Sequence, residues 1–179
     1  KSLEYTGQVA DGWAGTSFVP TGTAATIEHV QQGAVAAGRD PLDIEYQAGG
    51  AVQFGNDIEL LLAPRRSGVA FTLGAMGSAT TNFYNDAYSR GGFETEARKV
   101  QQLWVEGQRE EAIQAVPDEL ILQTNFLGTT SEVTERVRSY REAGISVLRV
   151  QPEGADMQER LDSLGAIVDI VKSLNNDDC

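Results

Sequence analysis

The chain has 179 residues, and its 26 Asp and Glu residues outnumber its 14 Lys and Arg residues, which gives a formal net charge of -12. This length fits one domain with its own core, and the acidic balance argues against nucleic acid or an anionic membrane as a partner. The single Cys, at position 179, excludes an internal disulfide, and without a membrane span or signal-peptide pattern we expect a reduced, cytoplasmic location.

The first third of the chain predicts two strands and the helix between them. Residues 1–9 resemble the end of a helix, and the small-residue segment 10–18 predicts a short buried strand. Apolar residues at helical spacing predict a helix over 23–37. Alternation in 44–54 predicts a second strand, in which Gly49-Gly50 indicates an unusual backbone or a close approach.

The middle third is predicted to be mostly helical. Residues 57–62 form a short helix that Pro64 should end, and residues 69–76 would add a fourth strand if they are extended. Further helices are expected over residues 94–106, over residues 108–116 and after Pro117.

The last third carries the clearest local signal. Thr129 and Glu132 have the spacing of a capping box and open a predicted helix that ends near Gly144. Residues 145–150 then predict a buried parallel strand, and residues 155–174 an amphipathic helix. Strands that alternate with helices imply parallel pairing, so we expect an α/β fold with about three strands.

Most polar candidates have a structural interpretation. His29 lies beside the apolar face of its helix and is expected on the surface, which argues against a catalytic triad; no His, Cys and carboxylate cluster has metal-ligand spacing. The glycine-rich stretch 74–78 matches no phosphate-binding motif and favours a plain loop. Residues 81–86 combine aromatic and amide side chains, and packing is favoured over a pocket lining.

Thr16 and Ser17 are the candidate ligand-binding residues. They follow the first predicted strand, and α/β sheets place ligands at the C-terminal ends of their strands. The alternative is that they only cap the next helix, and the spacing alone leaves both interpretations open.

Six motifs together carry a family resemblance. They are Ala10-Asp11-Gly12-Trp13, Gly38-Arg39-Asp40-Pro41, Gly74-Ala75-Met76-Gly77-Ser78, Asn82-Phe83-Tyr84-Asn85-Asp86, Ala115-Val116-Pro117-Asp118-Glu119-Leu120 and Tyr140-Arg141-Glu142-Ala143-Gly144-Ile145. In this order they resemble the luciferase-like monooxygenase family, in particular its branch of oxidoreductases that use the deazaflavin coenzyme F-420. The resemblance implies a (β/α)8 TIM barrel with a flavin or deazaflavin at its C-terminal mouth.

The resemblance covers only the C-terminal half of such a barrel. It implies a partial (β/α)8 barrel in which residues 1–179 form a single domain, with a helical insertion over 64–128. Residues 11–16, 44–48 and 145–150 would then correspond to barrel strands six, seven and eight. The other half of the family fold would hold a nonprolyl cis peptide and most of the loops that grip the cofactor ring.

Few site residues transfer through the resemblance. In sugar-phosphate-oxidising relatives, a Thr-Ser pair after strand six is followed by Gly-Lys, and the Thr and Lys hold the substrate phosphate. Thr16 and Ser17 match this pair, but Phe18 and Val19 replace Gly-Lys, so a more apolar substrate is expected. The implied cofactor is coenzyme F-420 or FMN; no residue is assigned to catalysis, to the cofactor or to a metal.

Two functions remain open. The first is the C-terminal portion of a flavin- or F-420-dependent oxidoreductase that transfers a hydride to or from a small organic substrate, and this portion alone should be inactive. The second is a non-catalytic truncated barrel that serves as an oligomeric or interaction module. Unpaired strand edges predict a homodimer or a separate N-terminal half-barrel as partner. Thr16 and Ser17 should lie at the same end of the sheet as Gly49 and Gln151.

Overall fold

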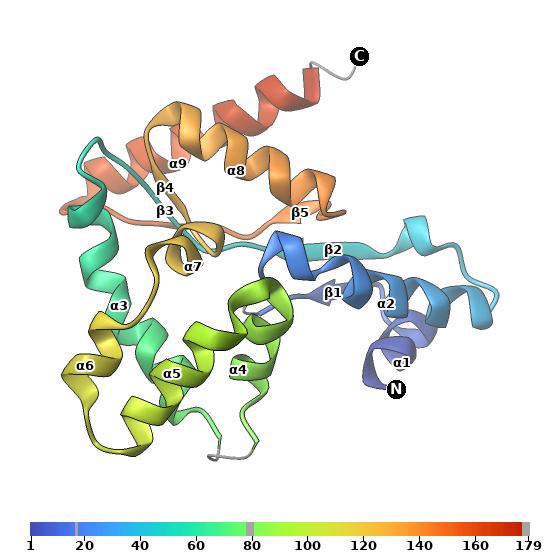
Figure 1. The fold of residues 1–179 in the computed structure, drawn as a ribbon. Helices are drawn as coiled ribbons and strands as arrows, with labels where there is room; N and C mark the ends of the chain where they lie inside the picture. Colours follow the sequence, from blue (N-terminus) through green and yellow to red (C-terminus); the bar gives the residue numbers. More distant parts are fainter. Residues whose placement is uncertain (17, 78–80, 177–179) are drawn as a thin grey trace.

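Short parallel strands form the centre of the molecule, and helices surround them (Figure 1). The computed structural model describes residues 1–16, 18–77 and 81–176. One sheet has the order β1-β2-β5 and the other β4-β3-β6, and every pairing is parallel. The strands are β1 (Gly12–Ala14), β2 (Glu45–Ala48), β3 (Ala51–Phe54), β4 (Phe126–Gly128), β5 (Val147–Leu148) and β6 (Gln151–Pro152). The expected α/β class is confirmed.

The two sheets meet at breaks in two of the strand segments. The segment 44–54 forms β2 and β3, with the break at Gly49-Gly50, whereas the predicted strand 145–150 contains only β5, and β6 follows it after a break at Arg149 and Val150. A Cβ on Gly49 would lie 1.9 Å from the carbonyl oxygen of Arg149, and a Cβ on Gly50 would lie 2.1 Å from that of Thr124. The predicted close approach at this glycine pair is therefore confirmed.

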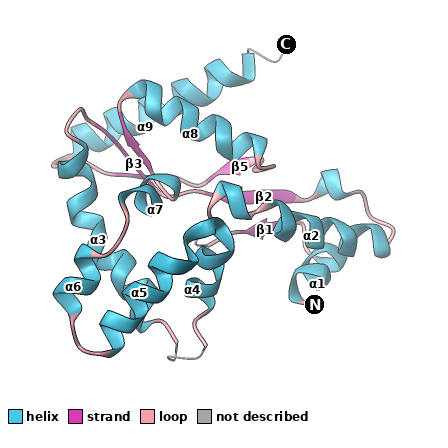
Figure 2. Ribbon diagram, viewed as in Figure 1, coloured by secondary structure: helices cyan, strands magenta, loops and turns pink. Residues whose placement is uncertain are grey.

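Helices cover the strands on several sides, as the colouring in Figure 2 shows. In the view of Figure 1, α3 to α6 lie below the strands and α8 and α9 lie above them. The helices are α1 (Ser2–Val9), α2 (Ala24–Ala36), α3 (Ile58–Ala75), α4 (Phe83–Tyr88), α5 (Glu94–Val105), α6 (Arg109–Gln114), α7 (Asp118–Gln123), α8 (Thr130–Glu142) and α9 (Met157–Asn176). Among the described residues, no helix combines the length and the apolar character that crossing a membrane requires.

Two hydrophobic cores hold these layers together. The first lies between the sheets and α2, α8 and α9, where the Tyr140 ring packs against Phe18 and Phe126 at centroid distances of 4.9 Å. The second joins α3, α5, α6 and α7 and includes Leu62, Leu73 and Leu120. The two cores adjoin at β4, because Phe126 belongs to the first core and Leu127 to the second.

Two predictions in the middle of the chain are wrong. Pro64 does not end a helix, because α3 continues through it to Ala75, anchored by the buried side chains of Leu61, Leu62 and Leu73. The same helix includes residues 69–75, which excludes an extended strand there. The additional strand is instead β4, whose three residues are all buried. Tertiary packing therefore overrides the local preference of proline.

The motif 38–41 has a structural role. Gly38 adopts a φ of 73°, as expected for a residue that ends a helix. Arg39 Nη1 donates hydrogen bonds of 2.8 Å to the carbonyl oxygens of Gly7 and Ala10 at the end of α1, and Asp40 accepts one from the backbone N–H of Leu42. The motif therefore joins α1 to the turn that leads into β2.

The predicted capping box at the start of α8 is confirmed. The backbone N–H of Thr129 donates to Glu132 Oε2 at 2.7 Å, and the backbone N–H of Glu132 donates to Thr129 Oγ1 at 3.4 Å. The hydrogen bond from the Thr129 backbone, followed by that from its hydroxyl, lowers the pKa of Glu132 below its ordinary value of 4.5. The ionised carboxylate is therefore the form that the fold favours.

This cap gives a prediction for acid solution. Because the pKa of Glu132 is lower in the folded chain, its contribution is complete above the unfolded pKa of about 4.5 and is lost as the pH falls through the folded pKa. Glu132→Gln should therefore lose less stability than the wild type between pH 7 and pH 3 in urea unfolding. Glu142→Gln, which removes an exposed carboxylate at the end of the same helix, should retain the wild-type pH dependence; an equal effect of both variants would contradict the prediction.

Candidate functional site

A cavity of about 740 Å³ opens where the two sheets meet. It is lined by residues from the strand breaks, from α3 and from the segment before β4, and we call it the strand-break cavity. Its polar and backbone lining includes Gly49, Gly50, Arg65, Asn125, Gln151 and Glu153. This position, at the C-terminal ends of β2 and β5 and the starts of β3 and β6, is where barrel-type α/β proteins bind ligands.

The central strands present a polar face and an apolar face. In β2 the side chains of Tyr46 and Ala48 are buried, while Glu45 is exposed and Gln47 half-buried. In β3, Val52 is buried and Gln53 is half-buried. Successive strand residues point to opposite faces, so one face packs against helices and the other carries amides and a carboxylate. A polar face of this kind suits ligand contact better than core packing.

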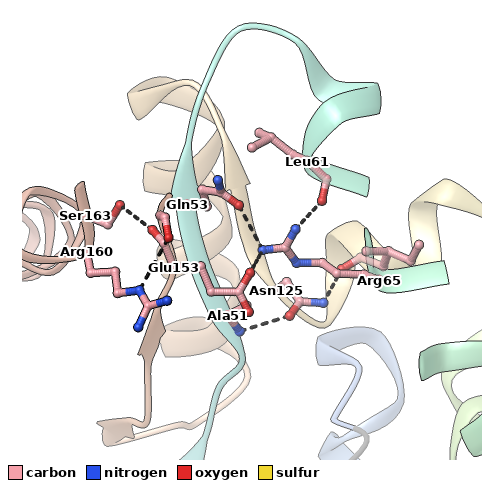
Figure 3. Close-up of polar contacts among 10 residues, drawn as sticks. Ala51, Gln53, Leu61, Arg65, Asn125, Glu153, Arg160 and Ser163 are labelled. Atoms are coloured by element: carbon pink, nitrogen blue, oxygen red, sulfur yellow. Dashed lines mark hydrogen bonds and ion pairs between the residues drawn. The ribbon is translucent and has the colours of Figure 1, made fainter. Parts of the chain in front are cut away.

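An arginine from α3 reaches the polar end of β3 (Figure 3). Arg65 Nη2 donates to Gln53 Oε1 at 3.1 Å and forms an ion pair with the carboxylate of Glu153, while Nη1 donates to the carbonyl oxygen of Leu61. Burial lowers the pKa of Arg65, and the charge of Glu153 opposes that shift. The Arg65 side chain is only 10% exposed, so its charge depends on these partners.

One donor of this arginine has no acceptor. Arg65 Nε is buried and has no hydrogen-bond partner among the described residues. A buried N–H without an acceptor costs about 1–3 kcal/mol, so an oxygen of a bound ligand would relieve that cost. Arg65 also lines the cavity, so its positively charged group, with one unused donor, forms part of the cavity wall.

An asparagine fixes the opposite wall of the cavity. Asn125 Oδ1 accepts a 2.9 Å hydrogen bond from the backbone N–H of Ala51, and Asn125 Nδ2 donates to the carbonyl oxygen of Ile121 at 2.9 Å. The end of α7 is thereby tied to the first residue of β3 (Figure 3). On the other side, Ser163 Oγ donates to the carbonyl oxygen of Glu153 at 3.2 Å, which ties β6 to α9.

Thr16 lies at the expected end of the first sheet. The backbone N–H of Gly15 donates to the carbonyl oxygen of Gln47 at 2.7 Å, and Arg149 Nη2 donates to that of Gly15 at 3.5 Å. Thr16 therefore follows β1 at the end where Gly49 follows β2, and Gln151 comes two residues after Arg149. Ser17 lies outside the described residues.

Thr16 lines a second, smaller cavity. This cavity has a volume of about 220 Å³ and includes Trp13, Thr16, Phe18 and Phe83 in its lining. Phe18 also lines the strand-break cavity, so the two cavities share this residue in their linings. The ligand-binding role of Thr16 and Ser17 stays a prediction, and so does their alternative role as helix caps.

The remaining candidates have structural roles. His29 is exposed on α2, as predicted. Asn82 caps α4 by accepting from the N–H groups of Tyr84 and Asn85, and Asn85 Nδ2 donates to the carbonyl oxygen of Ala97 at 2.8 Å. These two residues pack and cap as the packing interpretation of 81–86 predicts, whereas Phe83 lines the smaller cavity, as the pocket interpretation predicts. Gly74 belongs to α3 rather than to a loop. In the described part of the chain, no group of His, Cys, Asp and Glu is placed to hold a metal ion.

The sequence did not single out Gln53, Arg65 and Glu153. Arg65 is 12 residues from Gln53 and 88 residues from Glu153 along the chain, so no local spacing connects them. The sequence feature that could have indicated this cluster is the polar residues Gln53 and Glu153, which lie near the ends of otherwise apolar strand segments.

Parallel strands with helices around them form part of an α/β barrel, and a polar cavity lies at the strand ends. The luciferase-like monooxygenase family matches residues 1–146, and the chain belongs to this family. The chain is 26% identical over 166 residues to a Mycobacterium tuberculosis protein that is provisionally named a coenzyme F-420-dependent oxidoreductase. The matched segment makes up 92% of this chain and 48% of that protein.

Solved structures show the same fold. The coenzyme F-420-dependent tetrahydromethanopterin reductase of Methanopyrus kandleri matches with a TM-score of 0.70 and 21% identity, over 91% of this chain and 46% of the reductase. An F-420-dependent secondary alcohol dehydrogenase, solved with an F-420–acetone adduct, matches with a TM-score of 0.58 and 17% identity, over 94% of this chain and 45% of its own. The chain thus spans about half the length of the relatives that it matches.

Proposed function

We propose that this chain is a portion of an F-420-dependent oxidoreductase that transfers a hydride between the cofactor and a small organic substrate. The observation that carries the proposal is the strand-break cavity, which combines a buried cation with a polar strand end. Membership of the luciferase-like family supports it, and so do the names of the relatives, each of which refers to coenzyme F-420.

The residues that line the cavity suit a deazaflavin. Such a ring system has a polar edge of carbonyl and N–H groups and two flat apolar faces. The Arg65 guanidinium, which lines the cavity, can attract the oxygens of that edge, and Phe18, Val69 and Tyr88 give the cavity an apolar side. When bound, the cofactor supplies two-electron hydride chemistry, while these residues orient it and exclude water. FMN has a similar polar edge and is the alternative cofactor.

The adjoining small cavity suits the substrate. Its lining combines the Trp13, Phe18 and Phe83 rings with the hydroxyl of Thr16 and the guanidinium of Arg90, and no lysine follows Thr16 at the positions of Phe18 and Val19. A small organic molecule with an apolar part and one hydroxyl or carbonyl group is therefore the proposed substrate class.

The isolated chain should bind coenzyme F-420 only weakly, because it spans about half of the relatives' fold. We expect a dissociation constant above about 100 μM, which corresponds to about -5.5 kcal/mol. Quenching of F-420 fluorescence measures it, with FMN as the comparison. A dissociation constant near 1 μM would show that this half alone completes the binding site and would contradict the prediction.

Weak binding still tests the site. In NMR spectra of the chain with millimolar F-420, the Arg65 Nε–H signal and the Gly50 amide signal should shift. Arg98, an exposed residue paired with Glu94 on α5, supplies the control Nε–H signal and should not shift. If Arg65 and Gly50 are unchanged at the highest cofactor concentration, or if Arg98 shifts equally, the strand-break cavity is not the cofactor site.

A further inference from the structure

One arginine lies in the wall of the smaller cavity, which Thr16 also lines and which we call the Thr16 cavity. Arg90 is the only charged residue among the described residues of this lining, so no Asp or Glu is among them. The other lining residues contribute aromatic rings, aliphatic groups, a glycine and hydroxyl groups. A guanidinium with no carboxylate beside it in the lining suits an anionic group of a ligand.

The charge of Arg90 is not neutralised within the described part of the chain. Its guanidinium forms no hydrogen bond or ion pair there, whereas Arg65 and Arg98 each pair with a Glu side chain. Arg90 also lines a neighbouring polar cavity of about 450 Å³, but the carboxylates of Asp86 and Glu94 line that cavity as well. These carboxylates repel an anion, so the Thr16 cavity is the place where Arg90 can bind one.

Close backbone contacts fix the position of Arg90. It belongs to the kinked turn Ser89–Phe93 between α4 and α5. This turn packs against the short helix Pro20–Gly22, where Thr21 Oγ1 donates to the carbonyl oxygen of Gly91 at 3.1 Å across 70 positions of sequence. A Cβ on Gly91 would lie 2.8 Å from a side chain of the same loop, so glycine is required for this approach. The turn is therefore held against the loop that follows β1.

We propose that Arg90 binds a carboxylate of the substrate in the Thr16 cavity, so that the substrate is a small hydroxy acid or oxo acid with an apolar part. The proposal rests on the oxidoreductase function proposed above and narrows its substrate class. A guanidinium presents two parallel N–H groups that match the two oxygens of a carboxylate. The rings of Trp13, Phe18 and Phe83 provide contacts for the apolar part. The volume of about 220 Å³ suits a molecule smaller than a typical drug.

The cation comes from an element that the local sequence around Thr16 does not reveal. Phe18 and Val19 follow Thr16 where sugar-phosphate-oxidising relatives have Gly-Lys, and the missing lysine alone predicts a more apolar substrate. Arg90 supplies a positive charge to the same cavity from the turn after α4. One guanidinium balances the single charge of a carboxylate, whereas a phosphate group carries about -1.5 to -2 at pH 7. A carboxylate is therefore the anion that this lining fits best.

Matched ligands and the two tryptophans of the chain test the proposal. Mandelate combines a ring, a hydroxyl group and a carboxylate, and mandelamide replaces the carboxylate with a neutral amide. In NMR titrations of the full 179-residue chain at about 0.15 M salt, mandelate should shift the indole N–H signal of Trp13. The signal of Trp104, which packs against Phe71, should stay unchanged. We expect the dissociation constant of mandelate to be about tenfold or more below that of mandelamide.

Two arginine variants locate the anion site. Arg90→Gln removes the charge from an exposed side chain, so it should leave the fold intact and reduce the preference for mandelate to less than about twofold. Arg98→Gln removes an arginine that lines the neighbouring polar cavity and is not among the described residues of the Thr16 cavity. It should retain the full preference, and circular dichroism checks that both variants are folded.

Several results would overturn the proposal. If mandelate does not shift Trp13, or if mandelate and mandelamide bind equally well, the cavity does not recognise a carboxylate. An unchanged preference in Arg90→Gln, or a loss of preference in Arg98→Gln as well, would place the anion elsewhere. If inorganic phosphate shifts Trp13 at lower concentrations than mandelate, the site selects phosphate instead.

These titrations separate the anion site from the proposed oxidoreductase function, because they contain no cofactor. A chain that binds mandelate through Arg90 but does not bind F-420 in the fluorescence titration would retain the anion site and lose the support for hydride transfer. A chain that binds F-420 but shows no preference for mandelate would retain the proposed function and lose the acid substrate class.

Discussion

Glu153→Ala is expected to lower the free energy of unfolding by about 2–3 kcal/mol. The change removes the carboxylate that pairs with Arg65 and leaves a guanidinium that is 10% exposed without its counter-ion. Breaking a fully buried pair costs about 3–5 kcal/mol. The lower figure applies here because the Glu153 side chain is 36% exposed, so solvent screens part of the loss. Urea unfolding at pH 7 measures the change.

Two controls separate this charge effect from the loss of side-chain atoms. The double variant Arg65→Met/Glu153→Met removes both charges and should recover most of the stability lost in Glu153→Ala. Glu94→Ala breaks an exposed ion pair with Arg98 on α5 and should change the free energy of unfolding by less than about 0.5 kcal/mol. A double variant that is no more stable than Glu153→Ala would show that Arg65 does not depend on its partner.

Elements with a strong periodic pattern follow from the sequence. The capping box of Thr129 and Glu132 and the apolar stripe of Val133, Val137 and Tyr140 specify α8 within one residue of its observed start. Both signals are local, since each bond or contact joins residues three or four positions apart. Local signals also specify α2, because its apolar residues recur at helical spacing and the helix ends before Gly38.

The short strands could not be predicted in this way. Phe126–Gly128 is too short to show alternation, and its pairing with Val52 to Phe54 decides its conformation. The helix α3 is a second example. Pro64 locally favours the end of a helix, but buried residues on both sides of it keep α3 continuous. In both cases, contacts that are distant in sequence decide the local structure.

The candidate site was predicted only in its location. Parallel strands place their C-terminal ends together, which put Thr16 near Gly49 as expected. The cluster of Gln53, Arg65 and Glu153 depends on how α3 crosses the end of β3, and that crossing is set by the packing of the second core. Nothing in the sequence around a helix residue such as Arg65 indicates that its side chain reaches a strand end.

Gly49→Ala and Gly50→Ala are expected to cost about 3 kcal/mol or more each, because overpacking against backbone cannot be relieved by rotating a side chain. The new Cβ atoms would lie 1.9 Å from the carbonyl oxygen of Arg149 and 2.1 Å from that of Thr124. Relief requires the two strand segments, or the segment before β4, to move apart. Either movement would open the strand-break cavity at its centre.

Gly165→Ala is the matched control for these two variants. It lies in α9, and a Cβ there would meet no atom within 4 Å. Alanine in a helix interior is favoured over glycine by about 0.5–1 kcal/mol, so this variant should be more stable than the wild type. The same substitution is therefore expected to act with opposite sign at the strand break and in α9, as thermal and urea unfolding would show. If Gly49→Ala and Gly50→Ala unfolded like the wild type, the two segments would not need their close approach, and the strand break would have to be attributed to the helices that frame it.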